Sequence, residues 1–537
     1  MLDVKITGGT LLDGTGRPGY RAEIGIRDGI ITEIAPKLQE SAREVIDAEG
    51  LCVTPGFLDT HAHSDDAVFF RSDGYNCLEQ GITTQLVGNC GDSPAPYRKD
   101  CGVPLTTRPA APERLEEMMA AAKDCPTFLA AADRQEKGIN YAFLVGHNAL
   151  RLSVMGESPA APTPLQLQAM QEQIRLAMRA GYFGYSSGLV YAPSVYADTA
   201  ELTALAKASA EFGGLYASHI RGEGDHVLEA VREAIAVGRG AGCPVLISHI
   251  KIMGPNRAGK AQAMLRMIRE ANAEGVRVFA DQYPYDAGSA PLISQIPPKY
   301  LREGRAALLQ RLEEPQFRRQ VEHSIFHETE EFESCLYYAG YAGSRIAAAA
   351  ETPEAVGKTL TELAAAAGAA PVDAMAELLL RNHGTVQGVY TCMQMEDIRT
   401  FLADESVYAG TDWSAYPEHY SEEQVGGGHP RGTGAMFRRI EICREFRLRS
   451  PEACIRSMTG APAGAIGLRD RGLLRPGLAA DLCVLDWERA AAEADDLHPF
   501  RRNRGLAYVL LNGTVAVRGG RATGCYAGQV LRHAPVK

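Results

Sequence analysis

The chain has 537 residues, 45% of them hydrophobic and 23% charged, a composition typical of a globular protein that excludes a disordered one. This length exceeds what one core usually holds, so we expect a large domain and at least one smaller unit. The net charge of −11 argues against nucleic acid or an anionic membrane as a partner, and no basic run offsets it.

The sequence shows no targeting segment, so we expect a cytoplasmic protein. The sequence contains no run of about 18 apolar residues, so we expect no membrane-spanning helix. Its first segment, MLDVKITGGTLLDGTG, lacks the basic and apolar regions of a signal peptide. The twelve cysteines include no C-x-x-C pair, which argues against a zinc ribbon and against a disulfide scaffold.

Short strands with glycine turns fill the first fifty residues. They include Val4–Thr7 and the strands AEIGI and IITEI, which meet at Asp28–Gly29, a dipeptide typical of a tight hairpin. The same pattern returns near the end in LAADLCVLDW and around a second hairpin signal at Asn512–Gly513. Because two isolated β segments cannot each bury a face, we expect 1–54 and 468–537 to form one small β-sandwich domain.

The middle of the chain alternates helices and strands. One amphipathic helix should end at Gly181, and Asp198 with Glu201 resembles a capping box that begins the next. Strands follow in LYASHIR, PVLISHIKI, VRVFADQYPY, GVYTCMQ and SVYAGTDW, a pattern that predicts a parallel sheet with crossover helices. No glycine-rich phosphate loop follows the first of these strands. The expected fold is therefore α/β, a TIM-like (β/α)8 barrel.

A charged helical stretch interrupts this alternation at 291–350. We interpret it as an inserted subdomain that forms a lid over the mouth of the barrel. The predicted catalytic barrel then consists of residues 55–290 and 351–467, flanked by the β-sandwich domain at 1–54 and 468–537.

Histidines and an aspartate recur where strands end. In GFLDTHAHSD, His61 and His63 are two apart, so on a strand both imidazoles face one side and can bind one metal ion. His219, His249 and Asp412 end later strands, and the carboxyl ends of barrel strands meet at one rim. Any one of these residues could be a core histidine or a helix cap. Five at strand ends indicate a metal site.

Cys90 follows another apolar strand, in ITTQLVGNCGDSPAP between Gly88 and Gly91. A lone cysteine is usually buried and inert. A thiolate beside one or two metal ions would instead be deprotonated and could bridge them. Its place at a strand end favours the metal-binding interpretation.

Seven segments together resemble a known family. In chain order they are GFLDTHAHSD, GITTQLVGNCGDSPAP, YASHIRGEGD, LISHIKIMG, DQYPYDAGS, AGTDW and GGHPRGTG. They are similar to signature segments of the D-aminoacylase (N-acyl-D-amino-acid deacylase) family of the amidohydrolase superfamily. The resemblance covers nearly the whole chain, including LRPGLAADLCVLD near its end. The cysteine in GNCG is peculiar to this branch, because many relatives carry a carboxylated lysine there.

The resemblance implies the roles of the metal-binding and catalytic residues. It implies one tightly bound Zn²⁺ ion with Cys90, His219 and His249 as ligands. It further implies a second, weaker metal position at His61, His63 and Asp412. Asp412 is also implied as the catalytic general acid/base.

The resemblance also implies the substrate-binding residues. Tyr191 matches a residue of the substrate pocket, and the substrate's carboxylate would be held by Lys251, Tyr283, Ser289 and Arg431. Between Asp412 and Arg431, the segment WSAYPEHYSEEQVGGGH departs from the family pattern because it is longer and richer in tyrosine and acid. We expect this segment to border the pocket for the acyl group or the side chain.

The implied function is zinc-dependent hydrolysis of N-acyl-D-amino acids to a carboxylate and a free D-amino acid, through a metal-bound hydroxide and Asp412. The expected partner is this small-molecule substrate, and the sequence leaves the oligomeric state and the preferred D-amino acid open. One alternative is a cyclic amidohydrolase of the dihydropyrimidinase or dihydroorotase type on the same scaffold. The other is a non-enzymatic scaffold relative, which lost metal ligands would reveal, and none is missing here.

Overall fold

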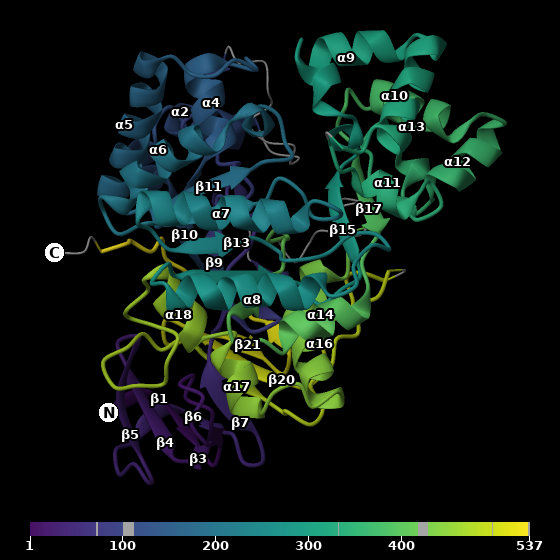
Figure 1. Cartoon of the computed structure of the whole chain (residues 1–537). Helices are drawn as coiled ribbons and strands as arrows, with labels where there is room; N and C mark the ends of the chain where they lie inside the picture. Colours follow the sequence, from purple (N-terminus) through teal and green to yellow (C-terminus); the bar gives the residue numbers. More distant parts are fainter. Residues whose placement is uncertain (71–73, 100–111, 331, 417–427, 497, 535–537) are drawn as a thin grey trace.

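Three regions make up the computed structural model (Figure 1). A barrel of strands and helices occupies the centre, a small β domain lies at one end of it, and a mostly helical insertion stands beside its opposite end. The structure describes residues 1–70, 74–99, 112–330, 332–416, 428–496 and 498–534.

The barrel confirms the predicted TIM-like fold. In the described part of the chain, eight strands form one parallel sheet in which each pairs with its neighbour in the order of the sequence. Just beyond the two edge strands, Ala62 and Trp413 form a parallel bridge, and the Thr60 amide donates to the Ala409 carbonyl at 3.1 Å. These contacts close the barrel. Its strands are β8 (Phe57–Asp59), β9 (Ile82–Val87), β10 (Asn140–Gly146), β11 (Gly184–Gly188), β12 (Leu215–His219), β13 (Val245–Ile247), β14 (Val278–Gln282) and β18 (Val407–Ala409).

Helices follow the strands in chain order, as a barrel requires. The predicted helix end at Gly181 is confirmed, because this residue has a φ of 108° and follows α5. Asp198 caps α6 by accepting a hydrogen bond from the Glu201 amide, but the Glu201 carboxylate pairs with Arg151, so only half of the expected capping box forms. The helices outside the insertion are α1 (Tyr75–Leu78), α2 (Pro112–Ala121), α3 (Cys125–Arg134), α4 (His147–Met155), α5 (Pro164–Ala180), α6 (Thr199–Ala210), α7 (Val227–Ala241), α8 (Lys260–Ala273), α14 (Met395–Leu402), α16 (Arg431–Glu445), α17 (Pro451–Arg456) and α18 (Gly460–Ile466).

Both chain ends build the small β domain, as predicted. Strand β7 pairs with β19 from the far end of the sequence, and apolar side chains of the two sheets share one buried cluster. The two hairpins form where expected, with positive φ at Asp28–Gly29 and at Asn512–Gly513. One sheet holds β1 (Leu2–Thr7), β4 (Glu23–Arg27), β5 (Ile30–Ala35) and β6 (Ala42–Asp47), and the other holds β2 (Thr10–Leu11), β3 (Tyr20–Arg21), β7 (Cys52–Pro55), β19 (Leu482–Leu485), β20 (Leu506–Leu511), β21 (Thr514–Arg518) and β22 (Arg521–Ala522).

The insertion differs from the prediction in one strand. The segment GVYTCMQ, expected in the barrel, contains β17 (Gln387–Thr391), which pairs antiparallel with β15 (Ala287–Pro291) and β16 (Ser344–Ala348). An isolated apolar strand looks the same in sequence whichever sheet it joins, so its pattern gave no warning. The residues that follow 350 up to β17 share one apolar cluster with the segment predicted as the insertion. Its helices are α9 (Arg305–Leu312), α10 (Pro315–His327), α11 (Cys335–Ala339), α12 (Leu360–Ala367) and α13 (Pro371–Arg381).

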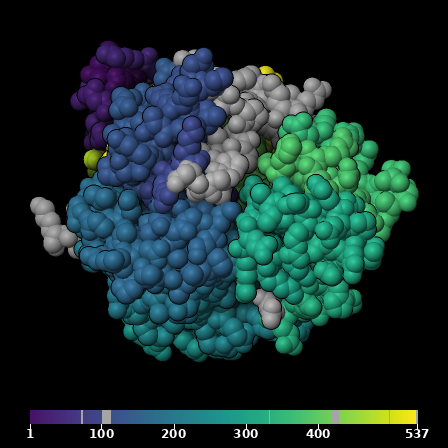
Figure 2. All heavy atoms as spheres, turned by 90° about the horizontal axis from the view of Figure 1, so that it is seen from above, coloured from purple at the N-terminus to yellow at the C-terminus, as the bar shows by residue number. Residues whose placement is uncertain are grey.

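Seen from above, the insertion and the barrel helices form two adjoining lobes (Figure 2). Side chains of both lobes line one cavity of about 820 Å³ at the carboxyl ends of the barrel strands. In the residues that the structure describes, no single helix is long and apolar enough to cross a membrane, and only the pair α12 and α13, bent by 95°, passes that test jointly by length and composition.

Candidate active site

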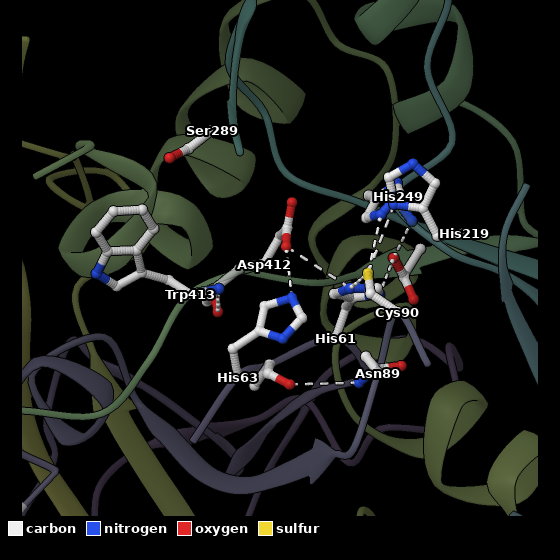
Figure 3. A network of polar contacts seen from close by, with 12 residues as sticks. His61, His63, Asn89, Cys90, His219, His249, Ser289, Asp412 and Trp413 are labelled. Carbon is white, nitrogen blue, oxygen red and sulfur yellow. Dashed lines mark hydrogen bonds and ion pairs between the residues drawn. The ribbon is translucent and has the colours of Figure 1, made fainter. Parts of the chain in front are cut away.

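The six predicted metal ligands converge at the carboxyl ends of the barrel strands (Figure 3). They come from the ends of β8, β9, β12, β13 and β18, and their ligand atoms fall into three overlapping sets, each within 4.8 Å. We call Cys90, His219 and His249 the Cys90 group, and His61, His63 and Asp412 the Asp412 group. His61 joins the two groups, because its Nε2 lies 3.4 Å from Cys90 Sγ and 3.6 Å from Asp412 Oδ1.

The distances around Cys90 fit a tetrahedral zinc ion. Its Sγ lies 3.6 Å from His219 Nδ1 and 3.5 Å from His249 Nε2. Bonds of about 2.3 Å to sulfur and about 2.0 Å to nitrogen, at a tetrahedral angle, would separate the two atoms by about 3.5 Å. One soft thiol and two imidazoles are also a donor set that suits zinc. The residues present therefore fit the metal that the sequence implied.

Unusual backbone conformations orient three of the ligand side chains toward the site. Cys90, His249 and Asp412 have φ values of 54°, 34° and 52°, in the left-handed region that non-glycine residues rarely adopt. Such strain concentrates at functional sites because the surrounding structure must hold it in place. Gly188 provides part of that support: a Cβ there would lie 2.0 Å from the Cys90 carbonyl oxygen, so only glycine fits without displacing it.

His61 and His63 lie just past the end of β8 and not on the strand itself. The bridge between Ala62 and Trp413 nevertheless keeps this stretch extended, and both imidazoles turn toward the site, with ring centroids 5.4 Å apart. The predicted orientation therefore holds, although barrel closure produces it and strand alternation does not.

Asp412 has protein partners on both carboxylate oxygens. His63 Nε2 lies 3.0 Å from its Oδ1, and Arg431 Nη1 forms an ion pair with its Oδ2 at 2.8 Å. Burial raises the pKa of Asp412, but Arg431 and the hydrogen bond from His63 outweigh it and hold the pKa well below its usual range. The carboxylate is thus ionised and able to accept a proton.

The pKa values of His219 and His249 shift in the opposite direction to that of His63. Burial lowers the pKa values of His219 and His249 well below normal, so both rings are neutral. Burial also lowers the pKa of His63, but the hydrogen bond and charge of Asp412 raise it by more. Burial raises the pKa of the Cys90 thiol, and a bound cation would counter this effect by stabilising the thiolate.

Three buried carboxylates that sequence reasoning missed surround the ligands. Glu223, within the quoted segment YASHIRGEGD, contacts His249 Nδ1 at 3.0 Å. Asp281 accepts a hydrogen bond from the His249 amide at 2.6 Å and lies 3.5 Å from His61 Nδ1. Asp59 accepts from the amide groups of the β8 and β18 ends, and burial raises its pKa to about 6. The sequence signal was weak, because Asp59 and Glu223 lie close to a ligand in sequence but Asp281 does not.

The five predicted substrate residues line the same cavity. The Tyr283 ring lies beneath two cations, 4.6 Å from Arg431 Cζ and 5.8 Å from Lys251 Nζ. Ser289 Oγ donates to the Gly388 carbonyl at 3.0 Å, and Tyr191 packs edge-on against a ligand imidazole at 5.1 Å between ring centroids. Two cations and an aromatic ring next to Asp412 form a surface that suits a carboxylate.

The segment that departs from the family pattern lies largely outside the described residues, at 417–427. Its two flanks are described. Trp413 packs near Arg431, with the guanidinium 5.4 Å from its ring, and His429 accepts a hydrogen bond from the Arg431 amide at 3.0 Å. These contacts fix the arginine at the start of α16.

Comparisons with known proteins show the family of this chain. A model of the amidohydrolase family matches residues 44–517. L-hydantoinase from Arthrobacter aurescens, with 15% identity and a TM-score of 0.57 over 99% of this chain and 100% of its own, shares the fold alone.

Three deacylases are much more similar. The chain is 35% identical to N-acyl-D-glutamate deacylase of Alcaligenes xylosoxydans xylosoxydans over 95% of this chain and 93% of that protein. It is 31% identical to D-aminoacylase of the same organism, over 98% and 97% of the two chains. N-acyl-D-glutamate deacylase of Bordetella bronchiseptica, solved with zinc and a phosphonate inhibitor, superposes with a TM-score of 0.82 at 35% identity over 99% of both chains. The chain therefore belongs to the amidohydrolase family and, within it, to the D-aminoacylase family.

Proposed function

We propose that this protein is a zinc-dependent deacylase that hydrolyses N-acyl-D-amino acids to a carboxylate and a free D-amino acid. The observation that carries the proposal is the position of Cys90, with its sulfur at zinc-like distances from imidazole nitrogens and beside a carboxylate-binding surface. The relatives at 31–35% identity are deacylases of this substrate class. A cytoplasmic location and a small-molecule partner remain predictions from the sequence.

The Cys90 group would hold the tight zinc ion, and the Asp412 group a weaker second position. The contacts support this ranking, because the ligand atoms of the Cys90 group face one another, whereas Asp412 already pairs with His63 and Arg431. A metal at the second position would have to come between Asp412 and His63, which are hydrogen-bonded to each other. For D-aminoacylase, activation by one metal and attenuation by a second have been described.

The chemistry divides among residues with fixed positions. Bound zinc would lower the pKa of a water molecule toward about 7 and polarise the amide carbonyl. Asp412 takes a proton from the attacking water and passes it to the leaving amine, a role worth about 10²–10⁴-fold in rate. The carboxylate of the amino acid is held by Arg431, Lys251, Tyr283 and Ser289. The scissile bond therefore lies beside Asp412.

Hydrolysis of a substrate panel tests the proposal. The panel holds N-acetyl derivatives of both enantiomers of several amino acids, with dihydrouracil and hydantoin, each assayed with and without a zinc chelator. We expect release of free D-amino acids that the chelator abolishes. Turnover of the cyclic amides alone would overturn the substrate class, and chelator-resistant turnover would overturn the role of zinc.

A further inference from the structure

Glu223 lies in the loop after β12, and its carboxylate is buried against the Cys90 group, with 4% of the residue exposed. Its Oε1 is 3.0 Å from His249 Nδ1, and its Oε2 is 3.6 Å from His219 Nε2. We propose that Glu223 is a positioning residue that orients both histidines for metal binding. The inference rests on the proposed zinc site.

The two imidazoles present different nitrogens to Cys90. His219 points its Nδ1 at Cys90 Sγ, whereas His249 points its Nε2 at the same sulfur. In each ring, the other nitrogen faces one oxygen of Glu223. A neutral imidazole that gives one lone pair to a metal carries its hydrogen on the opposite nitrogen. In the form of each ring that binds metal, the N–H group therefore faces the same carboxylate, at 3.0 Å in His249 and 3.6 Å in His219.

The position of Lys251 affects which nitrogen of His249 carries the hydrogen. Its Nζ lies 2.6 Å from both Glu223 Oε1 and His249 Nδ1. An ammonium group only donates, so its contact with Nδ1 favours the tautomer that has its hydrogen on Nε2, facing Cys90. That tautomer cannot bind metal through Nε2. Glu223 Oε1 gives Lys251 a second acceptor at 2.6 Å and also lies 3.0 Å from Nδ1, where it would face a hydrogen on that nitrogen, so it offsets the effect of Lys251.

The surrounding loop fixes Glu223 independently of any metal. Its backbone carbonyl accepts from the Met253 amide at 2.7 Å. Just beyond it, the amides of Gly224 and His226 donate to the carboxylate of Glu333 at 2.8 and 2.7 Å. Glu333 thus anchors the same loop through the amides of Gly224 and His226 and the hydroxyl of Tyr338, not through a histidine of the Cys90 group. It provides a matched control for a loss of loop structure.

Competition with a chelator of known zinc affinity tests the inference on the full-length protein. In Glu223→Gln we expect the zinc dissociation constant of the tight site to rise by about 10–100-fold, as for other groups that orient metal-binding histidines. In Glu333→Gln it should stay within about threefold of the wild type, whereas thermal stability falls in both variants. Equal zinc affinity in wild type and Glu223→Gln would overturn the inference. A wild-type protein that binds no zinc would overturn the proposed function instead.

A double variant separates the tautomer effect from the loss of charge. Because Lys251 no longer competes for Nδ1, Glu223→Gln/Lys251→Met should recover part of the zinc affinity that Glu223→Gln loses. Failure to recover any would contradict the tautomer argument. The double variant also removes both buried charges, so it guards against unfolding caused by an unpaired lysine. If Glu223→Gln does not fold, weaker zinc binding by the double variant than by Lys251→Met supports the inference, and equal binding overturns it.

Discussion

The Cys90 group and the Asp412 group lie within a few ångströms of each other but have different surroundings. His249 is 2% exposed at its side chain and contacts a buried carboxylate, whereas His63 is 31% exposed and contacts Asp412. The neutral imidazoles of the first group are ready to bind a cation, and the second group is already an ion-paired network. The difference supports the proposed division, in which the Cys90 group binds the tight zinc ion and Asp412 moves protons.

Removal of the sulfur should have the largest effect. We expect Cys90→Ala to lose stoichiometric zinc and at least 10³-fold of kcat/KM, because three ring nitrogens lose their common partner. Metal analysis after gel filtration and an N-acetyl-D-amino acid assay check this. The control is Cys125→Ala, a buried cysteine at the start of α3 that should keep its zinc. Full zinc content and turnover in Cys90→Ala would refute the metal assignment.

Asp412→Asn should separate the two groups. This variant keeps the shape of the side chain but loses a base, so kcat should fall by about 10²–10⁴-fold while the tight zinc stays bound. Zinc content and single-turnover rates measure the two effects separately. Loss of the tight zinc in this variant would place Asp412 among its ligands and contradict the division between the groups.

Two glycines allow each group to be displaced in turn. A Cβ at Gly188 would meet the Cys90 carbonyl oxygen at 2.0 Å, and one at Gly410 would meet His61 Cβ at 2.9 Å. We expect Gly188→Ala to weaken zinc binding by at least tenfold. Gly410→Ala should spare the tight zinc but lower kcat by up to about 10²-fold, since small displacements of catalytic groups are that costly. Identical behaviour of the two variants in zinc titration and turnover would show that the groups act as one unit.

The smallest effect is expected at the substrate carboxylate. Arg431→Lys keeps the charge but loses the planar pair of donors, so KM should rise by about tenfold with a smaller change in kcat. Steady-state kinetics on one N-acetyl-D-amino acid check this split. A fall in kcat with an unchanged KM would mean that Arg431 acts through its ion pair with Asp412 and does not bind the substrate.

The sequence predicted the site residues that recur at the ends of successive barrel strands. His219, His249 and Asp412 were recognisable because barrel strands end on one rim, so their spacing followed from the strand pattern. Glu223 and Asp281 were missed because a single acidic residue has no periodicity, and only the folded chain shows which nitrogen it faces. The resemblance supplied the metal and substrate roles that spacing alone left open.

The insertion shows the same limit of prediction from sequence, now for the fold. The barrel and both terminal hairpins were predicted, because local turn signals and alternation specify them. Strand β17 was wrongly given to the barrel, because its partner is set by antiparallel pairing across 96 or more residues of sequence with β15. Such long-range pairing has no local signature.

Zinc titration into the metal-free protein, with turnover of an N-acetyl-D-amino acid followed at each addition, tests the central claim most directly. The account predicts that activity rises linearly to a plateau at one equivalent of tightly bound zinc, with any second equivalent bound more weakly. Activity that requires two equivalents of similar affinity, or that is complete before any zinc is added, would contradict it.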